Sequence, residues 1–276
     1  MPMYKNIKIY DKIVKINYKD LMMMIIGAHG TKSKDSSLST FLIDNETTID
    51  AGNLIDGLGE EFLNVNSVFI THSHLDHIVD LPLIIDTMYD KLKHSINVYA
   101  TAPIIKALKD HMFNNIIWPD FSMIPLIGTS DKVIVYHEIE YDKEYKTFES
   151  TLTPFKNNHM NGSCGFIINN KVMLTSDTYK CDRIWEILNE NKKIDTLIIE
   201  ISFSSDLNGL AEASKHLTPS LLKEELTKLK RDDVHIYINH IKESSYHKIV
   251  KEIKELNLNV EILDNFVCIA NSKATV

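Results

Sequence analysis

The chain has 276 residues, of which 44% are hydrophobic and 25% are charged, and its formal net charge is −8 at pH 7. This composition is typical of a soluble globular protein and excludes a disordered or fibrous chain. An acidic surface repels polyanions, so the charge argues against binding of long nucleic acids, whereas a small anion can still be drawn to a bound cation.

The cysteines and the apolar runs indicate in which cellular compartment the protein is expected. Cys164, Cys181 and Cys268 lie far apart without Cys-x-x-Cys spacing, which favours reduced thiols over a disulfide framework or a thiolate zinc site. The early apolar run at residues 21–26 is too short to span a membrane and does not fit a cleaved signal peptide. We therefore expect a cytoplasmic protein without membrane attachment, folded as a single domain over residues 1–276.

Short β-prone runs fill the first part of the chain. Consecutive strands of one sheet are expected at residues 6–18, 21–26, 38–43, 48–49 and 67–71. A turn at Asp50-Ala51-Gly52 interrupts them. The last of these strands ends directly at a cluster of histidines, and a helical pattern over residues 78–92 follows, so the expected order is strand, ligand loop, helix.

The second part alternates helices and strands. Helices are expected at residues 102–113, 183–191, from 219 onward and at 246–256, with an irregular stretch around Trp118-Pro119. Further strands are expected at residues 133–136, 165–169, 172–175, 196–201, 234–238, 260–263 and 266–270, the second and third of them as a hairpin. Two sheet-rich halves with outer helices predict an α/β fold, an αββα sandwich.

The run His72-Ser73-His74-Leu75-Asp76-His77 concentrates metal-binding side chains at the end of a strand. Histidines at positions i and i+2 of an extended segment share a face and can grip one ion, while the acid and the histidine at the turn into a helix can point at a second ion. A fortuitous polar loop is the alternative, and it is far less common at this density of ligands. The run therefore predicts a metal site.

The spacing His-x-His-x-Asp-His after a strand resembles the signature of the metallo-β-lactamase superfamily, whose members are mostly binuclear hydrolases. The later candidates His159, Asp177 and His240 follow in the expected order, each near the end of a predicted strand. Each of the three, taken alone, is more often an ordinary surface or core residue. Their order behind the motif favours a ligand role.

The resemblance implies a specific set of ligands. One metal would be held by His72, His74 and His159, a second by Asp76, His77 and His240, with Asp177 bridging both. Nitrogen and oxygen ligands favour two Zn²⁺ ions, with Mn²⁺ or Fe²⁺ as alternatives. Asp50 matches the first motif of the superfamily, a buried acid that orients the ligand loop through hydrogen bonds, although a plain turn aspartate is the alternative.

A narrower resemblance covers most of the chain. Residues 27–43, 200–203, 210–219 and 238–242 are similar to the class II cyclic-nucleotide phosphodiesterases. This similarity implies that a hydroxide bridging two metals opens a 3′,5′-cyclic purine nucleotide, cAMP and/or cGMP, to the 5′-monophosphate. His216 would be the general acid, and Asp76 and Asp177 would complete the catalytic set. A histidine that merely packs against the helix beginning at Thr218-Pro219 is the alternative for His216.

Some features depart from this pattern or match nothing. Asp80 stands where a glycine or serine is usual, and the residues from Pro82 onward also differ, which raises the prospect of an altered rim of the site. Residues 109–148 match no known pattern, so any substrate contacts that this segment supplies stay unassigned. The remaining histidines, expected to be exposed or satisfied by structural bonds, are His29, His94, His111, His137, His235 and His247.

Other functions compete with the phosphodiesterase. A tRNA 3′-processing endonuclease shares the motif but needs a basic arm to grip RNA, and this acidic chain has no lysine- or arginine-rich insertion. Another metallo-β-lactamase-fold hydrolase, or a binding protein with a vestigial site, are further alternatives. A small-molecule cyclic nucleotide is the expected partner, and a homodimer is left open.

Overall fold

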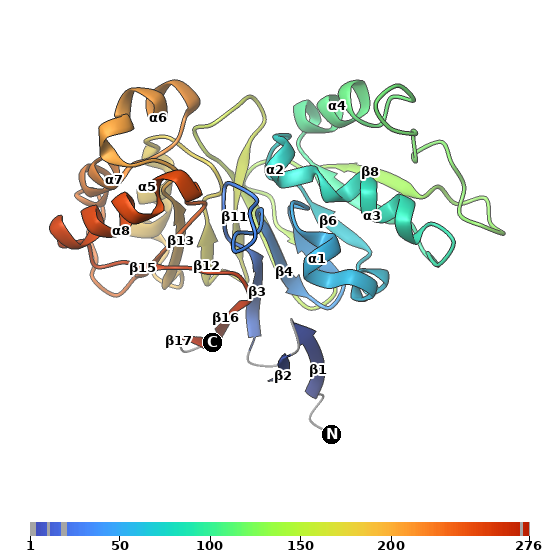
Figure 1. Cartoon of the computed structure of the whole chain (residues 1–276), viewed down its shortest axis with the longest axis horizontal. Helices are drawn as coiled ribbons and strands as arrows, with labels where there is room; N and C mark the ends of the chain where they lie inside the picture. The colour runs from blue at the N-terminus through green and yellow to red at the C-terminus, as the bar shows by residue number, and fades with distance from the viewer. Residues whose placement is uncertain (1–3, 10–11, 18–20, 271–272, 276) are drawn as a thin grey trace.

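The structure is a computed structural model, and it describes residues 4–9, 12–17, 21–270 and 273–275. Two large sheets face each other, with helices α1 to α4 on one outer side and α5 to α8 on the other (Figure 1). The predicted αββα sandwich is confirmed. Within the described residues no helix combines the length and the apolar character needed to cross a membrane.

The first sheet has eight strands in the order β17-β16-β3-β4-β5-β6-β7-β8. They are β3 (Leu21–Gly27), β4 (Thr40–Asp44), β5 (Thr47–Ile49), β6 (Ser67–Phe69), β7 (Ile96–Ala100), β8 (Ile134–Glu138), β16 (Val267–Ala270) and β17 (Lys273–Thr275). Strands β5 to β8 are parallel, and the C-terminal strand β16 pairs antiparallel with β3. The C-terminal strands thus join the sheet beside β3, the strand of this sheet that comes first along the chain.

The second sheet has seven strands in the order β15-β14-β13-β12-β11-β10-β9. They are β9 (Tyr145–Lys146), β10 (Thr151–Lys156), β11 (Cys164–Ile168), β12 (Val172–Leu174), β13 (Thr196–Glu200), β14 (His235–Asn239) and β15 (Glu261–Ile262). The predicted hairpin between β11 and β12 is confirmed, and it turns through Asn169 and Asn170 in the left-handed region. Strands β12 to β15 are parallel.

The helices cover the outer faces. They are α1 (Leu54–Leu58), α2 (Leu75–Ile78), α3 (Asp80–Met88), α4 (Ala102–His111), α5 (Asp182–Glu190), α6 (Asn208–Ser214), α7 (Pro219–Leu226) and α8 (Tyr246–Glu255), with short 3₁₀ segments at Gly59–Asn64, Ser205–Leu207 and Glu243–Ser245. Helix α7 begins as the sequence predicted, with Pro219 in its first turn and the Thr218 hydroxyl accepting from the Leu221 N–H.

Apolar side chains form three layers between these elements. One buried cluster, which includes Phe41, Phe69 and Phe166, fills the space between the two sheets. A second lies between the first sheet and α1 to α4, and a third between the second sheet and α5 to α8. Because the central parallel strands are buried on both faces, β13 is buried along its whole length, which explains its continuous apolar run. The three cysteines are free; Cys164 and Cys268 are buried, and Cys181 is partly buried.

One predicted pairing is wrong, and one predicted helix is shorter than expected. The segment 6–18 was expected to join the main sheet, but β1 (Tyr4–Ile9) and β2 (Lys12–Asn17) pair with each other in a separate two-stranded sheet; residues 10, 11 and 18 lie outside the described residues. Alternation reveals an extended segment without specifying its partner. The helix expected over residues 78–92 is present as α3, but it ends at Met88, and the separate short helix α2 precedes it.

Asp80 is part of the interior and not of an altered rim. Its side chain is buried, and its Oδ2 accepts a hydrogen bond from the Ile55 N–H at 2.9 Å, at the start of α1. Its own N–H donates to the Ala51 carbonyl at 2.9 Å. Burial raises the pKa of the Asp80 carboxyl, against the opposing effect of the hydrogen bond from Ile55. Pro82 lies in the first turn of α3, where the ring is tolerated.

We expect the substitution Asp80→Ala to lower the free energy of unfolding by about 1–3 kcal/mol, because it removes the cap of α1 and leaves the Ile55 N–H without its partner. Urea denaturation measures this difference. Asp86→Ala, at an exposed position of α3, the helix that also carries Asp80, is the control and should have little effect. Equal stability of the two variants would contradict the capping role.

Candidate metal centre

The predicted ligands come from loops at one end of the sandwich. Residues 71–77 follow β6 in the first sheet, whereas His159 follows β10, Asp177 follows β12 and His240 follows β14 in the second. The carboxyl ends of parallel strands lie along one edge of a sheet, so the loops behind β12 and β14 open on the same side of the second sheet. The short distances between ligand atoms place the loop behind β6 next to them. The site therefore lies between the two sheets and draws on both.

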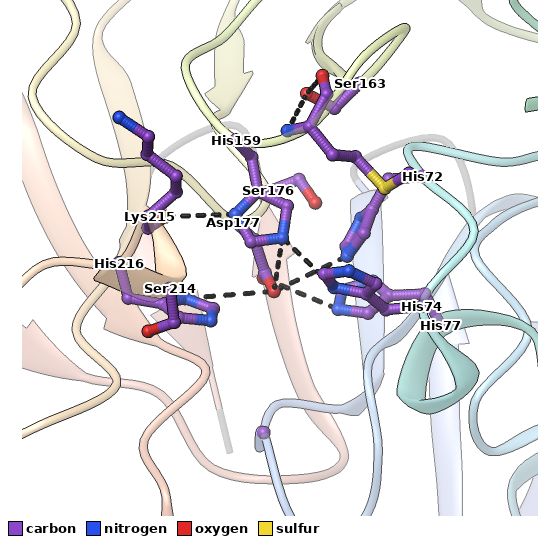
Figure 2. A network of polar contacts seen from close by, with 12 residues as sticks. His72, His74, His77, His159, Ser163, Ser176, Asp177, Ser214, Lys215 and His216 are labelled. Atoms are coloured by element: carbon purple, nitrogen blue, oxygen red, sulfur yellow. Dashed lines mark hydrogen bonds and ion pairs between the residues drawn. The ribbon is translucent and has the colours of Figure 1, made fainter. Parts of the chain in front are cut away.

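The first group of ligands is His72, His74, His159 and Asp177. Their potential ligand atoms all lie within 4.8 Å of one another. His159 Nε2 is 3.1 Å from His74 Nδ1, and His72 Nε2 is 3.6 Å from Asp177 Oδ2. Figure 2 shows these rings and the Asp177 carboxylate converging.

The second group is Asp76, His77, Asp177 and His240, whose ligand atoms meet the same 4.8 Å limit. His240 Nε2 lies 3.2 Å from His77 Nε2, from Asp76 Oδ2 and from Asp177 Oδ1. Asp177 is common to both groups. The structure thus brings all seven predicted ligand residues together, with the shared acid in the middle.

The chemistry of these groups fits two divalent cations. In the part of the chain that is described, His72 Nε2 and Asp177 Oδ1 are buried without a hydrogen-bond partner of good geometry, which is costly unless another group satisfies them. Moreover, Nε2 of His77 and Nε2 of His240 face each other at 3.2 Å, a contact in which only one of the two nitrogens can donate a proton to the other. Nitrogen and oxygen donors without sulfur suit Zn²⁺, Mn²⁺ or Fe²⁺.

Electrostatics prepares several of these side chains for binding a cation. Burial lowers the pKa of His72 well below its ordinary value, and burial also lowers the pKa of His74 and of His159, so these rings are neutral, as a metal ligand must be. Burial raises the pKa of Asp177, but the neighbouring His240 and His77 outweigh it and hold the pKa well below its usual range. Asp177 is therefore ionised.

Asp50 supports the ligand loop from beneath. Its Oδ2 accepts from His77 Nδ1 at 2.7 Å, and its Oδ1 accepts from the Thr71 N–H at 2.8 Å. Binding Nδ1–H in this way leaves Nε2 of His77 free to face the second group of ligands. Asp50 is thus a buried acid bonded to the segment that carries the candidate ligands.

Several residues at the site have left-handed backbone. Asp50, Ser176, Lys215 and His240 have φ between 54° and 61°, a region that residues other than glycine seldom occupy and that clusters at functional sites. His240 is held there by close packing: its N–H donates to the Ala28 carbonyl, and a Cβ on Gly30 would lie 2.7 Å from its ring. Glycine at position 30 is therefore required by contact with a ligand side chain.

His216 lies beside the ligand groups. Its Nδ1 is 2.8 Å from Glu200 Oε1, and its ring stacks on that of His240 with centroids 5.6 Å apart. Burial lowers the pKa of His216, but the charge of Glu200 and its hydrogen bond outweigh that effect, so the pKa is raised. The backbone carbonyl of Lys215, the residue before His216, accepts a hydrogen bond from His159 Nδ1 at 2.9 Å (Figure 2).

Sequence reasoning did not assign roles to Glu200, Ser202 or Asn157. The Ser202 hydroxyl lies 2.9 Å from Glu200 Oε2 and 2.9 Å from His240 Nδ1, so it connects the two. The Asn157 amide donates to the carbonyls of Thr175 and Asp177 and so fixes the loop of the shared acid. One feature of the sequence could have pointed to Glu200: it is an acid at the end of the apolar run Thr196–Glu200, and a buried acid needs a partner.

The other histidines stay outside the ligand groups. His94 and His137 bond to Leu63 and Asn97, respectively. His29 is buried, and its Nδ1 bonds Asn265 at 3.2 Å. His111, His235 and His247 are exposed, so the expectation for all six is confirmed.

Known proteins share this architecture. A protein of Yersinia pestis described as a probable 3′,5′-cyclic-nucleotide phosphodiesterase is 24% identical over 275 residues, covering 80% of this chain and 78% of the relative. Unliganded yeast PDE1 superposes with a TM-score of 0.70 at 16% identity, covering 88% of this chain and 98% of that one. The metallo-β-lactamase-fold protein YhfI of Bacillus subtilis gives 0.68 at 17% identity, covering 90% and 98%.

These comparisons confirm the predicted metallo-β-lactamase type of sandwich and the resemblance to cyclic-nucleotide phosphodiesterases. Residues 31–242 match the family model described as anti-Pycsar protein Apyc1. The matched segment contains both ligand groups and the Glu200–His216 pair. Because it spans well over half of the sequence, the chain belongs to the anti-Pycsar Apyc1 family.

Proposed function

We propose that this protein is a two-metal phosphodiesterase that opens 3′,5′-cyclic nucleotides to 5′-monophosphates. The observation that carries the proposal is the pair of ligand groups that share Asp177, with the Glu200–His216 pair beside them. The names of the Yersinia pestis relative and of yeast PDE1 point to the same chemistry.

The ligand residues would supply the reaction centre. The cations, when bound, neutralise charge on the phosphodiester and activate a water for attack on phosphorus. One would be held by His72, His74 and His159, the other by Asp76, His77 and His240, and both by Asp177. Asp76, whose side chain is 25% exposed, is more accessible than Asp177 and lies at the open side of the second group.

The Glu200–His216 pair would supply the proton for the leaving group. Glu200 engages Nδ1, which leaves Nε2 as the nitrogen that delivers a proton to the departing 3′-oxygen. Glu200 also stabilises the charged imidazole and fixes its orientation. His216 is thus the general acid in this proposal, and Glu200 is its positioning residue.

We extend the proposal to the organisation of the protein. Each sheet contributes ligands, so neither half of the sandwich completes a centre alone, which supports one catalytic domain over residues 1–276. Three free cysteines agree with a reducing, cytoplasmic compartment. Zn²⁺ is the proposed ion, since imidazole and carboxylate donors suit it.

The metal content tests the ligand assignment. The isolated protein should contain about two transition-metal ions per chain, and Asp177→Ala should lower activity at least about 100-fold, because loss even of groups that only support metal ligands costs 10–100-fold. Elemental analysis and turnover measure both. Asp232→Ala, at an exposed site, is the matched control. Active protein without metal would disprove the binuclear assignment.

The acid role of His216 has a distinct kinetic signature. His216→Ala should lower kcat on a cyclic nucleotide by roughly 10²–10⁴, and much less on bis(p-nitrophenyl) phosphate, whose leaving group needs no proton. The variant should keep its metal content, and His111→Ala, at an exposed position, should behave as wild type. Equal losses on both substrates would argue for a structural role instead.

The substrate can be ranked directly. We expect kcat/KM for cyclic AMP or cyclic GMP to exceed that for a pre-tRNA, because a long polyanion must approach an acidic surface without compensating cations. One buffer and one metal-loaded preparation serve for all three substrates. If the pre-tRNA is cleaved efficiently while both cyclic nucleotides stay intact, the phosphodiesterase proposal fails and the endonuclease function takes its place.

A further inference from the structure

The last turn of α6 lies against the first ligand group. Lys215 caps this helix in the left-handed region, with φ 60° and ψ 49°, and its N–H donates to the Glu212 carbonyl. The N–H of His216 donates to the Ala211 carbonyl at 2.8 Å. This pair of bonds is the Schellman motif, whose left-handed position is usually occupied by glycine. Such a conformation in a residue other than glycine often marks a functional site.

The left-handed turn directs the Lys215 carbonyl to a candidate metal ligand. His159 Nδ1 lies 2.9 Å from this oxygen. Because a carbonyl can only accept, Nδ1 of the neutral ring carries the proton and Nε2 keeps its lone pair. Nε2 faces the ligand group, at 3.1 Å from His74 Nδ1 and 3.9 Å from Asp177 Oδ2. The contact with Lys215 therefore selects the form of His159 that can bind a cation through Nε2.

His159 differs from other ligand rings in the kind of group that supports it. Asp50 bonds the ring of His77 through its side chain, and Ser202 does the same for His240. His159 is supported instead by a backbone oxygen, whose position depends on φ and ψ at residue 215. The backbone conformation at this one residue thus decides where the support for His159 lies.

The side chain of Lys215 leads away from the ligands (Figure 2). It is exposed, and its Nζ lies 5.5 Å from the centroid of the Tyr179 ring. The Tyr179 N–H donates at 2.9 Å to the carbonyl of Asn158, the residue before His159. A cation above a ring contributes only modestly at an exposed site. The backbone of Lys215, and not its ammonium group, is therefore the part expected to hold His159.

We propose that Lys215 is a positioning residue of the first ligand group, and that it acts through the left-handed turn that directs its backbone carbonyl to His159. The inference rests on the proposed function for the presence of a metal ion in that group. His216, the proposed general acid, is the next residue, and its ring centroid lies 5.0 Å from that of His159. One turn of backbone would then serve both a ligand and the acid.

Substitutions at position 215 separate the backbone from the side chain. Lys215→Gly keeps the left-handed turn and should bind Zn²⁺ as tightly as the unmodified protein in both binding steps. Lys215→Val strains the turn, because β-branched residues seldom adopt positive φ, and should weaken one of the two steps by about 10- to 100-fold. Competition for Zn²⁺ with a chromophoric chelator measures both affinities.

Helix α8 supplies a matched control. Asn257, at φ 51°, follows its end, where the Asn257 N–H donates to the Lys254 carbonyl and the Leu258 N–H to the Ile253 carbonyl. The same motif thus recurs outside the ligand groups. Asn257→Val should lower the free energy of unfolding of the metal-free protein in urea to a similar extent as Lys215→Val, yet leave both Zn²⁺ affinities unchanged.

The proton on His159 gives a second readout. In the Zn²⁺-loaded protein, long-range proton–nitrogen NMR should show His159 protonated at Nδ1, with slow exchange of this proton with solvent because the Lys215 carbonyl accepts it. Lys215→Gly should preserve the slow exchange, and Lys215→Val should accelerate it. If Lys215→Val does not fold, the unmodified protein still decides, since rapid exchange of its Nδ1 proton would overturn the inference.

The remaining outcomes distinguish this inference from the proposed function. Weaker Zn²⁺ binding by Lys215→Gly would assign the support to the side chain, and unchanged affinities in folded Lys215→Val would make the carbonyl dispensable, so either result overturns the inference. Two bound Zn²⁺ ions without hydrolysis of cyclic AMP or cyclic GMP would instead disprove the proposed function, and the role of Lys215 would stand on the affinities.

Discussion

The buried carboxylate of Asp177 is the feature on which the rest of this site depends. An ionised acid in the interior is stable only among groups that offset its charge, and here His77 and His240 lie within 3.4 Å and 3.2 Å of Oδ1 while His72 lies 3.6 Å from Oδ2. Those rings in turn belong to two separate groups of ligands. Asp177 therefore determines both the position of the cluster and its division into two.

Support for this acid extends well beyond the ligands. Asn157 donates to the backbone on both sides of the turn that carries Asp177, and Ser176, next to it, takes up a left-handed conformation. Asp50 likewise holds the ring of His77 in place through a hydrogen bond. The ring of His240 is held by its hydrogen bond with Ser202 and by close contact with Gly30. Rigid support of this kind keeps donor atoms close together although their loops follow four different strands.

The sequence predicted the centre better than its surroundings. The candidate ligand residues could be singled out because their residue types are few and their order along the chain matched a known signature, and the structure brings them together. The buried runs of the parallel strands could be predicted from their apolar continuity. The pairing of residues 6–18 was not, because alternation does not name a partner strand. Neither was the part played by Asp80, because it arises from a contact between segments distant in sequence, the hydrogen bond from Ile55 to Asp80.

The two sheets contribute different ligands to one centre: the loop after β6 supplies four, and the loops after β10, β12 and β14 supply the others. A cation bound there connects the two halves of the sandwich, in addition to the apolar layer between them. Since an unfolded chain cannot bring these loops together, every increment of metal affinity adds to the stability of the native state through mass action. Metal supply in the cell would then govern how long the folded protein survives as well as how fast it works.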